Sequence, residues 1–146
     1  MASVNAYDIR TDPEAMDIAA IHDFLSTAYW SPGVPREVVA RAVANSVCVG
    51  AFDAAGGQVG FARMVSDRAT FAYLSDVYVL QAHRGHGLAR RMVQALLAHP
   101  ELQGLRRVML ATRDAHGLYA QLGWKPLAAP ERFMEIHQPD VYGRAG

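Results

Sequence analysis

The chain has 146 residues, of which 51% are hydrophobic and 19% are charged, and this balance suits one folded domain over residues 1–146 rather than a disordered chain. Its 14 basic and 14 acidic residues give a formal net charge of zero, so a nucleic-acid partner is not expected, because proteins that bind nucleic acids usually carry a basic excess. No apolar run approaches the roughly 18 residues of a membrane-spanning helix, and the first ten residues lack a signal-peptide pattern, so no membrane association is expected.

Cys48 is the only cysteine, which excludes a disulfide within the chain and indicates a reducing compartment, so we expect a cytoplasmic location. Cys48 lies in the apolar run Ser46-Val47-Cys48-Val49-Gly50. We therefore interpret this thiol as a buried apolar group and not as a nucleophile.

Two helices are expected near the N-terminus, after a short first strand over residues 4–9. Asp12 followed by Pro13 is a favourable helix start, and apolar residues at helical spacing predict a helix over residues 13–29. Two prolines and a glycine in residues 31–35 break the chain. A second helix is predicted over residues 36–45.

The middle of the chain changes to the pattern of strands. Residues 47–52, 58–65 and 70–80 are each predicted to be extended, with turns at residues 53–57 and 67–68. Such short connections predict an antiparallel meander.

The last third of the chain returns to alternating helices and strands. A helix is predicted over residues 88–99, where Pro100 stops it. The strand at residues 107–112 follows this crossover helix and should run parallel to the strand at 70–80. A helix over residues 115–122 and two final strands at 124–127 and 133–137 complete an α/β (α+β) fold, with about four helices and a mixed sheet of six to seven strands.

The segment Arg84-Gly85-His86-Gly87-Leu88-Ala89 lies between a predicted strand and a predicted helix. Its glycines let the backbone bend sharply and approach a ligand closely. The helix start behind them offers unpaired N–H groups, which bind phosphate or pyrophosphate. Arg84, Arg90 and Arg91 add positive charge.

Two other phosphate-binding loops do not fit this segment. A P-loop requires a Gly-Lys-Ser/Thr ending, which is missing. The dinucleotide fingerprint requires a small residue where Arg90 stands, and an acidic residue where Ala111 and Thr112 stand. An ordinary glycine turn before a helix is the remaining alternative.

The flanking sequence resembles the GCN5-related N-acetyltransferase (GNAT) superfamily. Its Arg/Gln-x-x-Gly-x-Gly/Ala signature is matched by Arg84, Gly87 and Ala89. The segment Leu118-Tyr119-Ala120-Gln121-Leu122-Gly123-Trp124 resembles its Leu-Tyr-x-x-x-Gly-Phe motif, with Trp124 in place of Phe. The two motifs occur in the family's order, and the predicted elements match over nearly the whole chain.

The resemblance implies acetyl-CoA as co-substrate, held where the strands at 70–80 and 107–112 splay apart. The pantetheine arm is expected to hydrogen-bond to backbone near Val77 and Val79, and the pyrophosphate to lie on amides of the glycine segment. The cofactor-binding residues expected from this are Val77, Val79, Arg84, Gly85, His86, Gly87, Leu88, Ala89 and Arg90. Tyr119 matches the family tyrosine that protonates the departing thiolate, although it could also be a core residue.

The attacking amine must lose a proton, and the family has no single fixed base. Asp76 is our leading candidate for the base, with a structural carboxylate at a strand distortion as the alternative. His116 could also titrate near neutral pH. The residues expected to bind the acceptor are Tyr29, Trp30, Phe71, Tyr73 and His116, because aromatic side chains hold apolar or cationic amines.

The sequence therefore predicts an enzyme, an N-acetyltransferase that joins acetyl-CoA to a primary amine of a small molecule. A non-catalytic acyl-CoA sensor and a protein acetyltransferase remain alternatives. The histidines lack metal-ligand spacing, so no metal is predicted. The segment Phe133-Met134-Glu135-Ile136 could pair between subunits, which makes a homodimer plausible.

Overall fold

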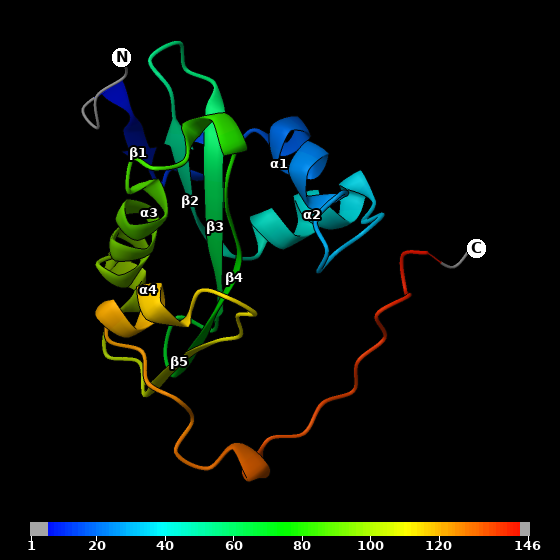
Figure 1. Ribbon diagram of the computed structural model, residues 1–146, viewed down its shortest axis with the longest axis vertical. Coiled ribbons are helices and arrows are strands. Elements are labelled where there is room, and N and C mark those ends of the chain that lie inside the picture. Colours follow the sequence, from blue (N-terminus) through cyan, green and yellow to red (C-terminus); the bar gives the residue numbers. More distant parts are fainter. Residues whose placement is uncertain (1–5, 144–146) are drawn as a thin grey trace.

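A five-stranded sheet with helices on both faces forms the centre of the computed structural model, which describes residues 6–143 (Figure 1). The strands lie in the order β1-β2-β3-β4-β5, and they are β1 (Asp8–Arg10), β2 (Val47–Phe52), β3 (Gln58–Ser66), β4 (Phe71–Val79) and β5 (Arg107–Leu110). The helices are α1 (Ile18–Leu25), α2 (Arg36–Ala44), α3 (Leu88–Leu97) and α4 (His116–Gln121), and short 3-10 turns lie at Pro13–Ala15, Gln81–His83, Pro100–Leu102 and Pro130–Arg132. No helix within residues 6–143 is long and apolar enough to cross a membrane.

The sheet separates two hydrophobic cores, as the side chains of β2 show. Val47, Val49 and Ala51 belong to the cluster that includes the inner face of α3. Cys48, which points the other way, belongs to the cluster of α1 and α2. All six residues of β2 are buried, as in a strand covered on both faces. The layers are therefore α3 and α4 on one side and α1 and α2 on the other, as Figure 1 shows.

The predicted meander and parallel crossover are both confirmed. β1 to β4 pair antiparallel in chain order, and β5 returns through α3 to pair parallel with β4. The parallel ladder joins only residues 71–74 to residues 107–110. Beyond Leu74, no strand within residues 6–143 pairs with β4 on that side, so the two strands part as expected.

A bulge distorts β4 at the point where the strands part. Phe61 pairs with Tyr78 and Arg63 pairs with Ser75, so two residues of β4 lie opposite the single residue Ala62. Asp76, one of the two, has a left-handed backbone with φ 57°. Bulges of this kind redirect side chains near functional sites.

The first helix is shorter than the predicted span of residues 13–29. A 3-10 turn covers Pro13–Ala15, and α1 begins only after Asp17, whose side chain accepts a hydrogen bond from the Ala20 amide. Asp12 and Pro13, the expected helix start, therefore begin the 3-10 turn and not the helix. Tyr29, expected at the end of the helix, lies beyond it. Of the first predicted strand, residues 4 and 5 lie outside the described residues, and β1 begins at Asp8.

The prediction of two final strands, over residues 124–127 and 133–137, is wrong. Neither segment is a strand in the structure, so the sheet of the described chain has five strands instead of six or seven. Pro126 interrupts the first segment and has no N–H for a ladder. The second segment has a strand-like pattern but no strand beside it, and its Met134 and Ile136 are 98% and 95% exposed.

Candidate functional site

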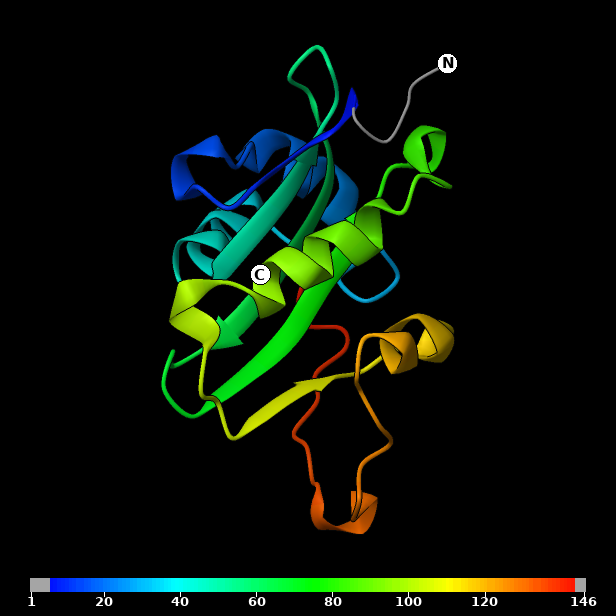
Figure 2. The ribbon, with the colours of Figure 1, turned by 90° about the vertical axis from the view of Figure 1, so that its left-hand side faces the viewer.

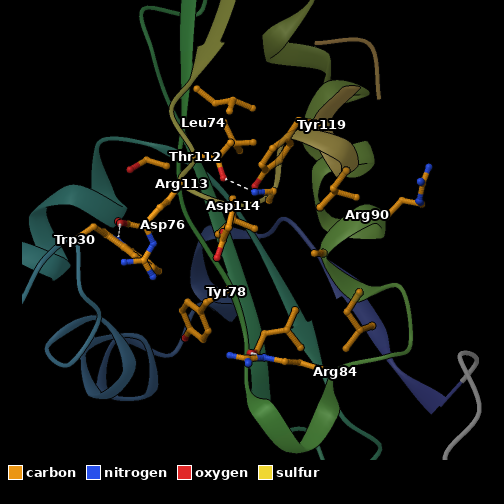
Figure 3. A pocket seen from close by; sticks show the side chains of 18 of the residues that line it. Trp30, Leu74, Asp76, Tyr78, Arg84, Arg90, Thr112, Arg113, Asp114 and Tyr119 are labelled. Atoms are coloured by element: carbon orange, nitrogen blue, oxygen red, sulfur yellow. Dashed lines mark hydrogen bonds between the residues drawn. The ribbon is translucent and has the colours of Figure 1, made fainter. Parts of the chain in front are cut away.

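A cavity of about 830 Å³ opens where β4 and β5 part. Its walls come from the second half of β4, the start of α3, the segment after β5, and α4. Aromatic residues in and after α1 close one end. Figure 3 shows Asp76 and Tyr119 on opposite sides of this pocket. Arg84 lies toward the end of the pocket that is farther from Tyr119 in this view.

The edge of β4 that faces the pocket can bind an extended ligand. Residues 75–79 have no strand on this side in the part of the chain that the structure describes, because β5 pairs only as far as Leu74. Val77 and Val79 both line the pocket. A ligand with amide groups can add to such an edge as a further strand.

The start of α3 has the properties of an anion site. Gly85 and Gly87 have φ of 87° and 70°, and no atom lies within 4 Å of a Cβ placed at either. Gly87 caps α3 without a side-chain hydrogen bond, so the first amides of the helix lack a side-chain cap. Phosphate groups bind where free amides and the helix dipole coincide.

Two arginines flank the glycine segment. The Arg84 Nε donates a hydrogen bond of 3.0 Å to the carbonyl of Val79, which holds the guanidinium at the end of the pocket. Arg90 donates to the Oε1 of Gln121 and so joins α3 to α4. Both arginines line the pocket, where their charge favours an anionic ligand.

Tyr119 lines the pocket from α4 and is only 8% exposed. Burial, with a smaller contribution from the charge of Asp114, raises the pKa of its phenol above the ordinary value of 10.0. The ring also packs edge-on against Trp124, with 5.7 Å between centroids. Tyr119 is therefore a proton donor at neutral pH on the wall of the cavity.

Asp76 is fixed by two hydrogen bonds. Its Oδ1 accepts from Trp30 Nε1 at 2.8 Å, and its Oδ2 accepts from Arg63 Nε at 2.6 Å. The side chains of Arg63 and Asp76 are 18% and 9% exposed, so the ion pair is largely buried. A carboxylate has about four acceptor positions, so Asp76, which lines the pocket, retains acceptor capacity beyond these two bonds.

An aromatic wall borders the end of the cavity near α1. Phe24 stacks on Tyr78 with ring centroids 3.9 Å apart, and Trp30 touches both Phe24 and Tyr29. The Arg113 guanidinium lies 3.9 Å from the centre of the Tyr29 ring. The pKa of Tyr78 is raised, chiefly by burial and then by nearby carboxylates, so this phenol stays neutral.

Sequence reasoning did not identify Phe24, Tyr78, Arg113 or Asp114 as pocket residues. Arg113 and Asp114 could have been found from the sequence, because polar residues directly after a buried parallel strand lie at the sheet edge where binding sites form. Phe24 has no such signal, since its place on an amphipathic helix resembles that of any packed residue.

Most of the predicted site residues line one cavity. The pocket contains Tyr119 and Asp76, the acceptor residues Tyr29, Trp30 and Tyr73, and the cofactor residues Val77, Val79, Arg84, Gly85, Gly87, Leu88, Ala89 and Arg90.

Three predicted site residues lie elsewhere. Phe71 stands at the start of β4, opposite Arg107 in the register. His116 lines a different groove, on the far side of β5. His86 contacts the ring of Tyr7, with centroids 5.3 Å apart. In residues 6–143, no group of three or more His, Cys, Asp or Glu side chains is placed to hold a metal ion.

Comparison with known proteins identifies the family. The model of the acetyltransferase (GNAT) family matches residues 13–124, and the chain belongs to this family. A candidate acetyltransferase of Gibberella zeae, FG08082, is 35% identical over 142 residues, which cover 82% of this chain and 79% of that protein.

Solved structures share the fold. A candidate GNAT acetyltransferase from Xanthomonas campestris pv. campestris has a TM-score of 0.90 and 47% identity, and the match covers 94% of this chain and 97% of that one. A candidate acetyltransferase from Clostridium acetobutylicum, solved with acetyl-CoA, has a TM-score of 0.66 and 15% identity over 90% of this chain and 96% of that one. The resemblance seen in the two motifs is thus confirmed. Acyl transfer, with acetyl-CoA as the co-substrate, is the chemistry of the GNAT family.

Proposed function

We propose that this protein transfers the acetyl group of acetyl-CoA to a primary amine of a small molecule. The observation that carries the proposal is that one cavity joins an open strand edge, a glycine-lined helix start and a buried tyrosine. Acetyl-CoA offers a matching series of groups: amides in its pantetheine arm, a diphosphate, and a thioester. The similar fold solved with acetyl-CoA supports the same choice of co-substrate.

The binding residues divide along the length of the pocket. The backbone near Val77 and Val79 hydrogen-bonds to the pantetheine amides, as a strand would. The amides that follow Gly87 bind the diphosphate, and Arg84 and Arg90 add charge. Backbone N–H groups at the β4 bulge stabilise negative charge on the thioester oxygen as the amine attacks.

Tyr119 and Asp76 handle the two protons of the reaction. Asp76 takes a proton from the amine, directly or through a water molecule, and the amine nitrogen then bonds to the carbonyl carbon. As the carbon–sulfur bond breaks, the Tyr119 hydroxyl gives its proton to the sulfur. The nitrogen, which still carries one proton too many after the attack, gives that proton to the tyrosinate and so restores the hydroxyl. The products are an amide and a free thiol, and no oxidant or metal is required.

Transfer is direct, without an acyl-enzyme. Cys48 is the only cysteine in the chain, and it is 5% exposed within the core of α1 and α2. Burial is the main cause that raises the pKa of its thiol to about 12. A protonated, buried thiol is a poor nucleophile.

The acceptor end favours a small amine. Tyr29 and Trp30 are 57% and 42% exposed at the aromatic wall. Their faces can hold an apolar or cationic group by contact and cation–π attraction. Arg113, beside Tyr29, offers a cation for an anionic group on the same acceptor.

The test is release of free thiol from acetyl-CoA over a panel of small primary amines, with calorimetry of coenzyme A binding in parallel. We expect binding and amine-dependent thiol release with at least one small amine. Binding without turnover on any amine would favour a sensor, and labelled acetyl groups found on peptides instead would favour a protein acetyltransferase. No binding of coenzyme A would overturn the proposal.

A further inference from the structure

Arg113 is a cation of the pocket that pairs with no carboxylate within residues 6–143. It belongs to the segment at residues 111–115, which continues to α4 after β5 has turned away from β4 (Figure 2). The other two arginines that line the pocket, Arg84 and Arg90, each donate a hydrogen bond to another residue. The N–H groups of Arg113 donate none in the part of the chain that the structure describes, so they are available to a ligand.

An aromatic ring holds the Arg113 guanidinium in place. Its central carbon lies 3.9 Å from the centre of the Tyr29 ring, and an arginine held over a ring can still donate hydrogen bonds. Tyr29 packs edge-on against Trp30, with 5.1 Å between ring centroids, and Trp30 donates its 2.8 Å hydrogen bond to Asp76. A continuous series of contacts thus links Arg113 to the carboxylate proposed as the base. Figure 3 shows Trp30, Asp76 and Arg113 across the pocket from Tyr119.

The charges at this end of the pocket do not suit an acceptor that is only a cation. Asp76 is already paired with Arg63, with 2.6 Å between Oδ2 and Nε. Asp114, which also lines the pocket and whose charge acts on Tyr119, is balanced by the charge of Arg113. A simple alkylammonium or a polyamine therefore meets no excess of negative charge. A zwitterion can instead place its ammonium near a carboxylate and its anionic group on Arg113.

A single available guanidinium matches a carboxylate better than a phosphate. The guanidinium and the carboxylate are both planar, and they can form two parallel hydrogen bonds. Phosphate groups more often bind a helix start or a cluster of cations. In this pocket that combination lies at the other end, where Arg84 and Arg90 flank the start of α3.

We propose that the acceptor is an amine that also carries a carboxylate, as in an amino acid, and that Arg113 binds this carboxylate. The ammonium faces Asp76, and the carbon skeleton between the two charged groups lies on Tyr29 and Trp30. The acetyl group leaves the sulfur and bonds to the nitrogen. Of the two protons that the ammonium loses, one ends on the thiol and one passes through Asp76 to solvent, while the carboxylate stays unchanged. The inference rests on the proposed function, because it places the acceptor in the pocket assigned to acetyl-CoA.

The test measures free-thiol release with the common amino acids and β-alanine, each compared with the amine that lacks only its carboxylate. At least one amino acid should have a kcat/KM roughly 10-fold or more above that of its partner amine. In Arg113→Gln, kcat/KM for this amino acid should fall by roughly 10- to 100-fold, the usual effect of losing a hydrogen bond between charged groups. The value for the partner amine should not fall, and this difference separates recognition of the carboxylate from a general loss of structure.

Two further variants serve as controls. Arg113→Lys keeps the charge and should retain part of the preference for the amino acid. Arg107→Gln also removes an arginine that lies over an aromatic ring, 5.3 Å from the centre of Phe133, but Arg107 does not line this pocket. It should leave the preference unchanged. Because Arg113 is exposed, its variants should fold and bind coenzyme A as the wild type does, which calorimetry checks.

The outcomes separate this inference from the proposed function. Turnover of amines with no preference for a carboxylate, or an equal loss for both acceptors in Arg113→Gln, would overturn the inference and leave acetyl transfer standing. A stronger preference for phosphoethanolamine than for any amino acid would overturn the choice of carboxylate. If nothing is turned over, calorimetry of the amino acids with the complex of protein and coenzyme A decides. Binding that exceeds that of the partner amine and is lost in Arg113→Gln would support the inference alone, and no binding of any amino acid would overturn it.

Discussion

In the proposed mechanism, Tyr119 is the residue on which acetyl transfer depends most. Tyr119→Phe removes one hydroxyl from a buried ring and leaves its packing on Trp124 intact. If Tyr119 protonates the thiolate, kcat should fall by roughly 10²-fold or more, the usual effect of losing a general acid. Coenzyme A binding, measured by calorimetry, should not change. Equal kcat values for the two proteins would remove Tyr119 from the mechanism.

The direction of the Tyr119 pKa also predicts the pH dependence of the reaction. Since burial raises this pKa above 10.0, the proton-donating form persists at neutral and mildly alkaline pH. Loss of activity from ionisation of Tyr119 should therefore occur at higher pH than for an ordinary tyrosine, whose pKa is 10.0. A pH–rate profile of the wild type and of Tyr119→Phe, compared over the range in which the protein stays folded, checks this. An alkaline fall centred near neutral pH in the wild type alone would contradict it.

Asp76 can act as a base or as a positioning residue, and two variants separate these roles. Asp76→Asn keeps a side chain that tolerates the left-handed backbone and can still accept from Trp30, but it cannot take a proton. If Asp76 is the base, kcat should fall by roughly 10²-fold in Asp76→Asn. Trp30→Phe removes the hydrogen bond to Asp76 and leaves the carboxylate in place. If Asp76→Asn keeps its kcat while Trp30→Phe loses kcat, Asp76 acts by holding Trp30 and is not the base.

At the scale of single elements, Gly87 at the start of α3 and Gly104 before β5 offer a matched pair of substitutions. Gly87 and Gly104 have φ of 70° and 73°, and a Cβ at either meets no atom within 4 Å. An alanine at either position should therefore cost a similar free energy of unfolding, about 1–2 kcal/mol for the left-handed backbone. Only Gly87 lines the pocket, so only Gly87→Ala should weaken coenzyme A binding.

Urea denaturation and calorimetry on the two glycine variants give the comparison directly. Equal losses of stability with a selective loss of binding would support the glycine segment as the diphosphate site. If Gly87→Ala bound coenzyme A as tightly as Gly104→Ala, close approach of the ligand at Gly87 would be excluded.

The elements that sequence reasoning predicted well are those determined by local signals. The glycine segment, the helix that follows it and the Tyr119 motif are each specified within a few consecutive residues. The meander followed from short turns between strand-like runs, and the parallel β5 followed from its crossover helix.

The features that sequence reasoning did not predict depend on contacts between distant parts of the chain. The segment at residues 133–137 has the pattern of a strand, yet a strand exists only where another strand offers a ladder. The bonds from Trp30 and Arg63 to Asp76 join three separate elements, and no spacing in the sequence marks them. Phe71 and His116 have suitable chemistry, but Phe71 lies at the start of β4, where β5 still pairs with it. His116, at the start of α4, lines a different groove.

The whole molecule has two parts that meet at the pocket. β1 to β4 form a continuous antiparallel sheet between α3 and the pair α1 and α2. β5 joins this sheet through only four residue pairs, and α4 follows directly from it. Acetyl-CoA bound as proposed would touch both parts, because β4 and α3 form one wall and residues 110–119 the other.

This arrangement predicts where coenzyme A should change the dynamics of the protein. A ligand that binds only the folded state opposes local unfolding of the elements that it touches. Hydrogen exchange of residues 107–122 should therefore slow when coenzyme A is added, whereas β2, buried on both faces, should change little. Gly87→Ala, with weakened binding, should reduce the effect, and Gly104→Ala should retain it. Slowing confined to α3, with residues 107–122 unchanged, would mean that the ligand lies on one wall only and does not occupy the cleft between β4 and β5.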